Sequence, residues 1–200
     1  RIWKLWGKVL VASVPAAIAG ILFDKILEKL SGKDIDGWLY NAPVVVAALI
    51  IYGIFFILIE KFNKKKAVVE SVDDITLGQS FAIGVFQMLA IIPGTSRSGS
   101  TIVAGRLVGM DSESAANYSF LASIPIMLGV MAKQLISESS RTYIAANWGM
   151  LAISNLVAFI SGLIAIYFVM KYLKKKGSLK VFGWYRIVLA SIVIIFQLLL

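Results

Sequence analysis

The stretch that decides how this chain folds is Pro93-Gly94-Thr95-Ser96-Arg97-Ser98-Gly99-Ser100-Thr101. Apolar segments flank it on both sides, at residues 81–92 and 102–110. An arginine at the centre of a membrane segment costs roughly 2.5–3.5 kcal/mol unless it faces protein or water. Non-helical backbone is tolerated at that depth only where it is packed in protein or lines a cavity. The stretch therefore predicts a site rather than a lipid-facing turn.

The residue types of this stretch favour phosphate binding. Gly94 and Gly99 allow a tight turn and a close approach to a ligand, and the exposed N–H groups of such a turn bind anions. A helix that begins near Ser98 directs its positive end into the loop. Arg97 offers a planar fork that matches phosphate oxygens. Further donors are the hydroxyls of Thr95, Ser96, Ser98, Ser100 and Thr101.

A purely structural interpretation is also open. Pro93-Gly94 can end one helix, a serine can cap the next, and Arg97 can snorkel to the surface. The functional interpretation is the favoured one of the two. The stretch is no Walker A loop, because the Gly-Lys-Ser/Thr ending is missing.

The composition indicates an integral membrane protein. The 200 residues are 59% hydrophobic and 16% charged, and their mean hydropathy is +0.85. Soluble domains are about 45–50% apolar and about 25% charged. The net charge of +9 lies mostly in a few clusters, which is typical of membrane-protein loops and not of a nucleic-acid-binding surface. The absence of cysteine and histidine excludes thiolate chemistry and a histidine base within these residues.

The hydropathy pattern predicts an all-α polytopic fold with five membrane spans and one re-entrant helix–loop–helix. The re-entrant segment is expected at residues 76–110, because Pro93-Gly94 leaves two halves that are each too short to span comfortably. A single broken span over the same residues is the alternative. The whole chain is expected to be one membrane domain, with spans at residues 6–23, 42–59, 114–136, 148–170 and 181–200.

The positive charges support the re-entrant interpretation independently. Basic clusters lie at residues 1–8, 61–66 and 171–180, and the positive-inside rule places all three in the cytoplasm. With five spans, all three clusters can lie in the cytoplasm only if residues 76–110 enter and leave the membrane on the same side. The polar segments 24–41 and 137–147 are then loops on the outer side.

Several polar residues have two interpretations each. Residues 111–114 indicate a helix start, with capping favoured over catalysis for the two acids. Gln87 is either a contact between helices or a supporting group of the site. Arg186 lies about one turn inside the last span, where snorkelling is slightly favoured over a second anion contact.

A family resemblance extends this interpretation. The run from Gly84 to Ile102, GVFQMLAIIPGTSRSGSTI, looks like the second signature of the bacterial undecaprenyl-diphosphate phosphatases, the bacitracin-resistance family. Residues 119–125 (SFLASIP) and Tyr185-Arg186 resemble the same family. The resemblance implies hydrolysis of undecaprenyl diphosphate to undecaprenyl phosphate and phosphate, which recycles the cell-wall carrier lipid. It also implies the bacterial plasma (inner) membrane, an inverted repeat with two re-entrant hairpins, and an active site that opens outward.

The resemblance and the loop chemistry together predict which residues act in catalysis and which bind the substrate. Arg97, with Ser96 and Ser98, is expected to be catalytic and to hold the transferred phosphoryl group. Substrate binding is expected from Gly94, Thr95, Gly99, Ser100, Thr101 and Gln87. No metal site is assigned, although a divalent cation, Mg or Ca, is compatible with the chemistry.

The family's first signature, which ends in a Pro-Val-Ser-Ser-Thr-Gly-His loop, is absent from the sequence. The resemblance places a histidine, a serine and paired glutamates there. The expected partners are therefore an N-terminal hairpin of the same protein, a lipid diphosphate and the bilayer, but no nucleic acid. The oligomeric state is left open, a homodimer included.

Two other functions compete with hydrolysis. A lipid flippase or transporter also uses broken helices, and a membrane scaffold could use the loop as a packing elbow. Phosphate release in detergent separates the first from a phosphatase, because transport needs two compartments. Indifference to substitution of Arg97 identifies the second.

Overall fold

The computed structural model describes residues 2–31, 39–62, 67–176 and 178–199. In these ranges the regular structure is helical, and the segments between the helices include one isolated bridge between Val69 and Met110. The helices are α1 (Ile2–Ser31), α3 (Ala42–Phe62), α4 (Leu77–Met88), the 3-10 helix η1 (Leu89–Ile91), α5 (Arg97–Leu107), α6 (Ser112–Ile136), α7 (Glu138–Ala146), α8 (Trp148–Lys176) and α9 (Lys180–Leu199).

Five of these helices are long and apolar enough to cross a membrane: α1, α3, α6, α8 and α9. The predicted all-α polytopic fold is therefore confirmed. The helices run a few residues beyond most of the expected spans, because helical hydrogen bonding continues into the charged flanks. For example, α1 continues through residues 24–31, which were expected to be part of an outer loop, and ends at Ser31.

The short helices α4 and α5 form a hairpin whose two ends lie together. Thr76 caps α4 in a capping box with Gln79, a sequence-local device that fixes the helix start. The amide of Gln79 donates to the carbonyl of Val108 at the other end of the hairpin, at 2.9 Å. The N–H of Val68 donates to the Gly109 carbonyl at 2.8 Å. The segment thus enters and leaves on one side, as a re-entrant hairpin requires.

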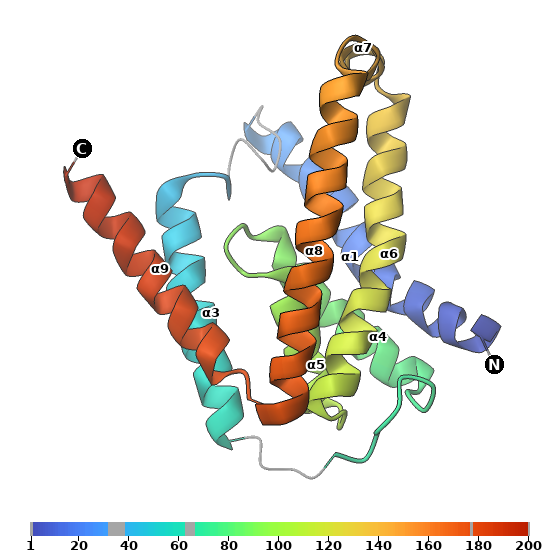
Figure 1. Cartoon of the computed structure of the whole chain (residues 1–200), viewed down its shortest axis with the longest axis vertical. Coiled ribbons are helices and arrows are strands. Elements are labelled where there is room, and N and C mark those ends of the chain that lie inside the picture. Colours follow the sequence, from blue (N-terminus) through green and yellow to red (C-terminus); the bar gives the residue numbers. More distant parts are fainter. Residues whose placement is uncertain (1, 32–38, 63–66, 177, 200) are drawn as a thin grey trace.

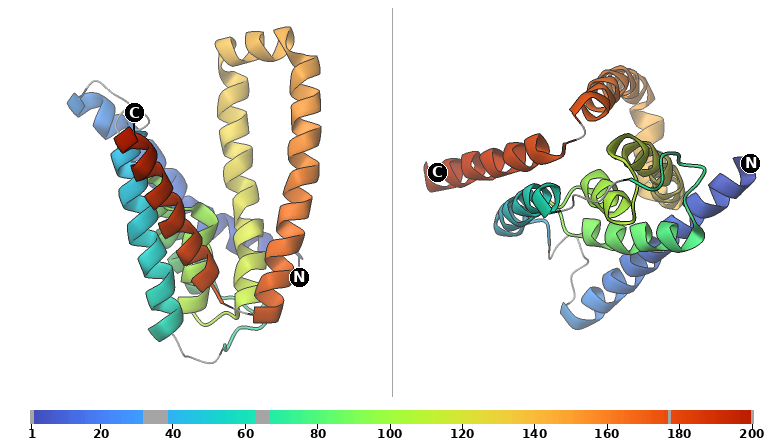
Figure 2. Two further views of the ribbon diagram at one scale, coloured as in Figure 1. Left: turned by 60° about the vertical axis from the view of Figure 1, so that its left-hand side comes forward. Right: turned by 90° about the horizontal axis from the view of Figure 1, so that it is seen from below.

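Two helix pairs flank this hairpin. In Figures 1 and 2, α6 and α8 form one long pair joined by α7, and α3 and α9 form another. Helix α1 crosses α4 at Gly84, where an added Cβ would overlap the carbonyl of Ala12. Helices α3 and α9 cross at Gly53 and Gly183, and a Cβ on Gly183 would lie 2.8 Å from the Gly53 carbonyl oxygen. Small residues at such crossings let membrane helices approach closely.

One end of the fold brings together parts of two of the three basic clusters. The ends of α3 and α8 and the starts of α6 and α9 meet at the lower end of Figure 1. There Glu60 accepts from the N–H of Leu179 at 3.2 Å, and Lys174 lies 3.4 Å from Glu113. Described lysines of two basic clusters therefore share one end of the molecule. Lys64, Lys65 and Lys66 lie outside the described residues.

One expected loop is a helix. Residues 137–147 were expected to be a polar loop, but Glu138–Ala146 form α7. The extended backbone of Ser137 ends α6, and the following Arg, Tyr, Ile and Ala residues tolerate a helix well. The expected helix start at residues 111–114 is confirmed, since Asp111 accepts from the N–H of Ser114 at 2.7 Å.

Candidate functional site

The loop between η1 and α5 is held from inside by Thr95. This residue is fully buried, and its hydroxyl donates to the Leu89 carbonyl at 2.9 Å. Gly94 has a φ of +93°, and an added Cβ would lie 2.7 Å from the carbonyl oxygen of Val45 in α3. Thr95 therefore shapes the loop and does not present its hydroxyl to a ligand in this structure.

Ser96 begins α5 in a strained conformation. Its φ is +70°, the one positive value at a non-glycine residue in the described chain, and such residues concentrate at functional sites. The Ser96 hydroxyl oxygen accepts from the N–H of Gly99 at 3.2 Å and lies 3.4 Å from the hydroxyl of Ser98. The helix thus starts with its N–H groups directed toward the loop, as anion binding requires.

Two pockets lie on either side of this helix start. The Arg97 pocket has a volume of about 490 Å³ and lies between α1, α4 and α6, where Arg97 and Gln87 line it. The Arg186 pocket has a volume of about 310 Å³ and lies between α3, α5, α8 and α9; Ser96, Ser98 and Arg186 line it. The structure therefore separates Arg97 from the two serines that the sequence grouped with it.

The Arg97 pocket holds two polar groups with spare donors. The Arg97 guanidinium is half-buried, and its Nη1 donates weakly to the Ser123 carbonyl at 3.4 Å. Among the described residues no carboxylate forms an ion pair with it. Gln87 is buried, and its amide nitrogen has no partner in the described chain. A buried donor without a partner costs roughly 1–3 kcal/mol, so this pocket is suited to an anion with several acceptor oxygens.

Ser100 and Thr101 lie inside the fold and line neither pocket. Both are buried, and the Thr101 hydroxyl lies 2.6 Å from the hydroxyl of Ser119 in α6. This contact fixes the start of α5 against α6. The Ser100 hydroxyl has no partner among the described residues. Gly99 packs so closely on Phe56 that an added Cβ would overlap the ring.

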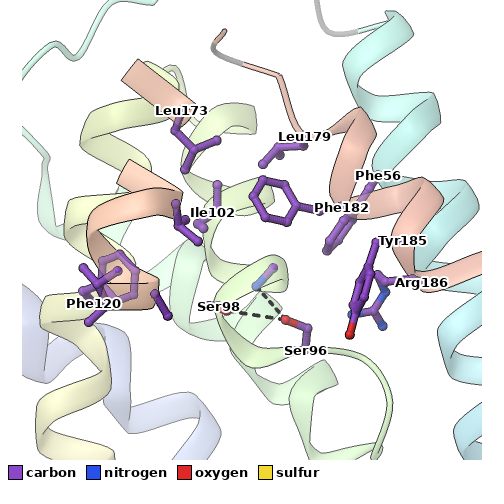
Figure 3. A pocket seen from close by; sticks show the side chains of 14 residues that line it. Phe56, Ser96, Ser98, Ile102, Phe120, Leu173, Leu179, Phe182, Tyr185 and Arg186 are labelled. Atoms are coloured by element: carbon purple, nitrogen blue, oxygen red, sulfur yellow. Dashed lines mark hydrogen bonds between the residues drawn. The ribbon is translucent and has the colours of Figure 1, made fainter. Parts of the chain in front are cut away.

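Arg186 is the residue whose position the sequence did not reveal. Snorkelling was favoured and is wrong: Arg186 is 6% exposed. Its Nη2 donates to the Gly94 carbonyl, and its guanidinium lies 5.4 Å from the centre of the Phe56 ring. The signal that could have identified it was the family-like pair Tyr185-Arg186. Figure 3 shows it beside Tyr185 on the wall opposite Ser98.

No cluster of three or more histidine, cysteine or acidic side chains suited to a metal occurs in the described parts of the chain. The linings of both pockets contain arginine, serine, glutamine and lysine, but no carboxylate. Mg²⁺ and Ca²⁺ need anionic oxygen ligands. These linings fit an anion and do not fit a divalent cation.

Taken together, the fold and the site define a class: a polytopic helical membrane protein that carries a loop of serine, glycine and arginine on a hairpin of two short helices. Comparison with known sequences is more specific. The family described as Bacitracin resistance protein BacA matches residues 1–192. The chain belongs to this family.

Curated relatives cover nearly the whole chain. "Undecaprenyl-diphosphatase 1" of Clostridioides difficile (strain 630) is 41% identical over 98% of the chain and 68% of its own length. "Undecaprenyl-diphosphatase" of Enterococcus faecalis is 43% identical over 96% of the chain and 67% of its own length. The protein of the same name from Aquifex aeolicus is 37% identical over 96% of the chain and 72% of its own length. The chain thus spans about two thirds of the length of these relatives, whose names favour hydrolysis over lipid flipping.

Proposed function

We propose that this chain provides the phosphate-binding part of an undecaprenyl-diphosphate phosphatase. The observation that carries this proposal is that half-buried Arg97 and buried Gln87 bring unused donors into one pocket at the start of a helix. A diphosphate on a long lipid supplies both the acceptor oxygens and a reason for the membrane setting. The names of the relatives support this substrate.

In the proposed reaction Arg97 contacts the terminal phosphoryl group. Water attacks its phosphorus, the anhydride bond breaks, and undecaprenyl phosphate and inorganic phosphate leave. Negative charge spreads over the phosphoryl oxygens in the transition state, and the Arg97 fork stabilises it there. Gln87 donates to a further oxygen. Ser96 keeps the helix start in place through its bond to Gly99.

The proton chemistry is proposed to come from outside these 200 residues. The sequence has no histidine, and neither pocket is lined by a carboxylate that could act as a base. A divalent cation would likewise need carboxylates that the described linings do not offer. We therefore derive no step through a metal here.

The proposed location is the bacterial plasma membrane, with the active site open to the outer face. The lysine-rich helix ends mark the cytoplasmic side. The Arg97 pocket extends away from that side along α1 and α6, to Ile21 and Lys133. A substrate head group at the outer surface can reach Arg97 by this route.

The test is phosphate release from farnesyl diphosphate and undecaprenyl diphosphate in detergent. The chain is assayed alone and joined to the part of the Enterococcus faecalis relative that lies outside the matched region. We expect activity in the joined protein only. Activity in neither protein contradicts the proposed function, and full activity of the chain alone contradicts the external proton chemistry.

Substitution of Arg97 in the active protein tests its role. Arg97→Ala is expected to lower kcat/KM by about 10³-fold and Arg97→Lys by about 10²-fold, because a point charge cannot reproduce the fork. The matched control is Arg106→Lys at the other end of α5, which lines neither pocket and keeps a donor for Ser112. Near-normal turnover of Arg97→Ala refutes the assignment.

A further inference from the structure

Arg186 carries a buried positive charge for which the described chain provides no counter-ion. It is 6% exposed, and its guanidinium contacts the Gly94 carbonyl and the Phe56 ring. Its Nε has no partner among the described residues. A buried charge without an opposite charge costs several kcal/mol, so buried charges are normally paired. An anion is therefore the missing neighbour.

The Arg186 pocket offers this anion more donors. Ser96 and Ser98 line it beside the positive end of α5. The Ser96 oxygen accepts from Gly99 and lies 3.4 Å from the Ser98 hydroxyl, so at most one of these two hydroxyls donates to the other, and the second can donate to a ligand. Figure 3 shows the serines below the pocket and Tyr185 with Arg186 along one side. The polar part of the pocket is thus positive or hydrogen-donating throughout.

The rest of the pocket is apolar, and α8 forms one wall of it. The α8 wall is exposed: between residues 148 and 172 no side chain of α8 is buried. Figure 2 shows α8 and α9 diverging from the loop that joins them. A free ion needs no such wall, whereas a hydrocarbon chain does. The apolar lining comprises Phe56, Ile102, Phe120, Ala165, Ile166, Val169, Leu173, Leu179 and Phe182.

We propose that the Arg186 pocket binds the phosphate group of a lipid phosphate, on the side of α5 away from Arg97. The ligand class is a phosphate monoester or diester of an apolar lipid, whose hydrocarbon chain enters between α8 and α9. Arg186 and the two serine hydroxyls bind the phosphate oxygens, and the apolar wall receives the first part of the chain. The inference goes beyond the proposed function, because it concerns binding and requires no hydrolysis.

The test measures binding in the Arg97→Ala variant, so that the Arg97 pocket does not contribute. Native mass spectrometry of the detergent-solubilised full chain is carried out with farnesyl phosphate, phosphatidylglycerol, inorganic phosphate and farnesol. We expect one bound farnesyl phosphate or phosphatidylglycerol, and the stronger of the two identifies the source of the lipid phosphate. Farnesol should bind at least about 30-fold more weakly, because a buried charge pair is lost. Binding of inorganic phosphate alone, or equal binding of farnesol, overturns the proposal.

Two further variants separate the pocket from general folding. Ala165→Trp fills the pocket from α8 and leaves the contact of Arg186 with Gly94 in place. Ala158→Trp makes the same change about two turns away on an exposed part of α8. We expect loss of lipid phosphate binding in the first variant and in Arg186→Gln, and unchanged binding in the second. Equal binding in both tryptophan variants overturns the proposal. Hydrolysis is assayed separately in the joined protein with Arg97 intact, so lipid phosphate binding without hydrolysis there contradicts only the proposed function.

Discussion

Substitution of Gly94 tests whether the loop is fixed by contact with α3. Gly94→Ala places a Cβ at a φ of +93°, 2.7 Å from the Val45 carbonyl oxygen and 3.0 Å from the Cβ of Ala48. The left-handed backbone costs roughly 1–2 kcal/mol for a residue with a Cβ. The overlap with fixed backbone adds about 1–3 kcal/mol. We therefore expect the free energy of unfolding to fall by about 2–5 kcal/mol.

The matched control is Gly109→Ala at the other end of α5. Its φ is +99°, but the nearest atom to an added Cβ is the Cβ of Val68 at 3.9 Å. Only the backbone term of about 1–2 kcal/mol applies there. Because both variants share that term, the difference between them isolates the contact with α3.

The assay is unfolding by SDS in mixed micelles, followed by tryptophan fluorescence. The double variant Ala48→Gly with Gly94→Ala should recover only part of the loss, because the Val45 carbonyl remains. In the hydrolysis assay Gly94→Ala should be less active than Gly109→Ala under conditions where both are folded, since the Gly94 carbonyl accepts from Arg186. Equal destabilisation by the two alanines refutes the reasoning.

Three further predictions use the same assays. Gly84→Ala should lower the free energy of unfolding by about 1–3 kcal/mol, because the added Cβ overlaps the Ala12 carbonyl. Gly78→Ala in the same helix meets open space and should leave that free energy unchanged or raise it. The reverse order contradicts the close α1–α4 crossing. Gln87→Met should leave the free energy of unfolding unchanged or higher, because it removes a buried amide without a partner. The same variant should lower kcat/KM about tenfold, and an unchanged kcat/KM contradicts a role for Gln87 in substrate binding. Asp111→Ala should lower the free energy of unfolding by about 1 kcal/mol through loss of the helix cap, and Asp111→Asn should lower it much less. Equal decreases in the two variants contradict a capping role.

The sequence carried much information about the hairpin. Apolar segments too short to span, a Pro93-Gly94 break and three basic clusters together predicted a segment that returns to its starting side. These signals are local, since each depends on hydropathy, backbone restriction or charge within a few residues. The contact of Gln79 with Val108 agrees with that prediction.

The sequence could not assign the loop residues to surfaces. Neighbouring residues at a helix start point in different directions, and only packing determines which space each one meets. Arg97 reaches the α1–α4–α6 side, whereas Ser96 and Ser98 meet the α8–α9 side. Thr95, Ser100 and Thr101 turn into the interior, although as hydroxyl residues they looked equivalent to the others.

What the sequence alone determined is the membrane class, the spans and the interrupted hairpin. These depend on composition and on short-range backbone preferences. What only the tertiary structure decided is the burial of Arg186 and the existence of two separate pockets. The close glycine crossing of α3 and α9 at Gly53 and Gly183 brings Arg186 to the Gly94 carbonyl. That contact joins residues 92 positions apart, and no local pattern specifies it.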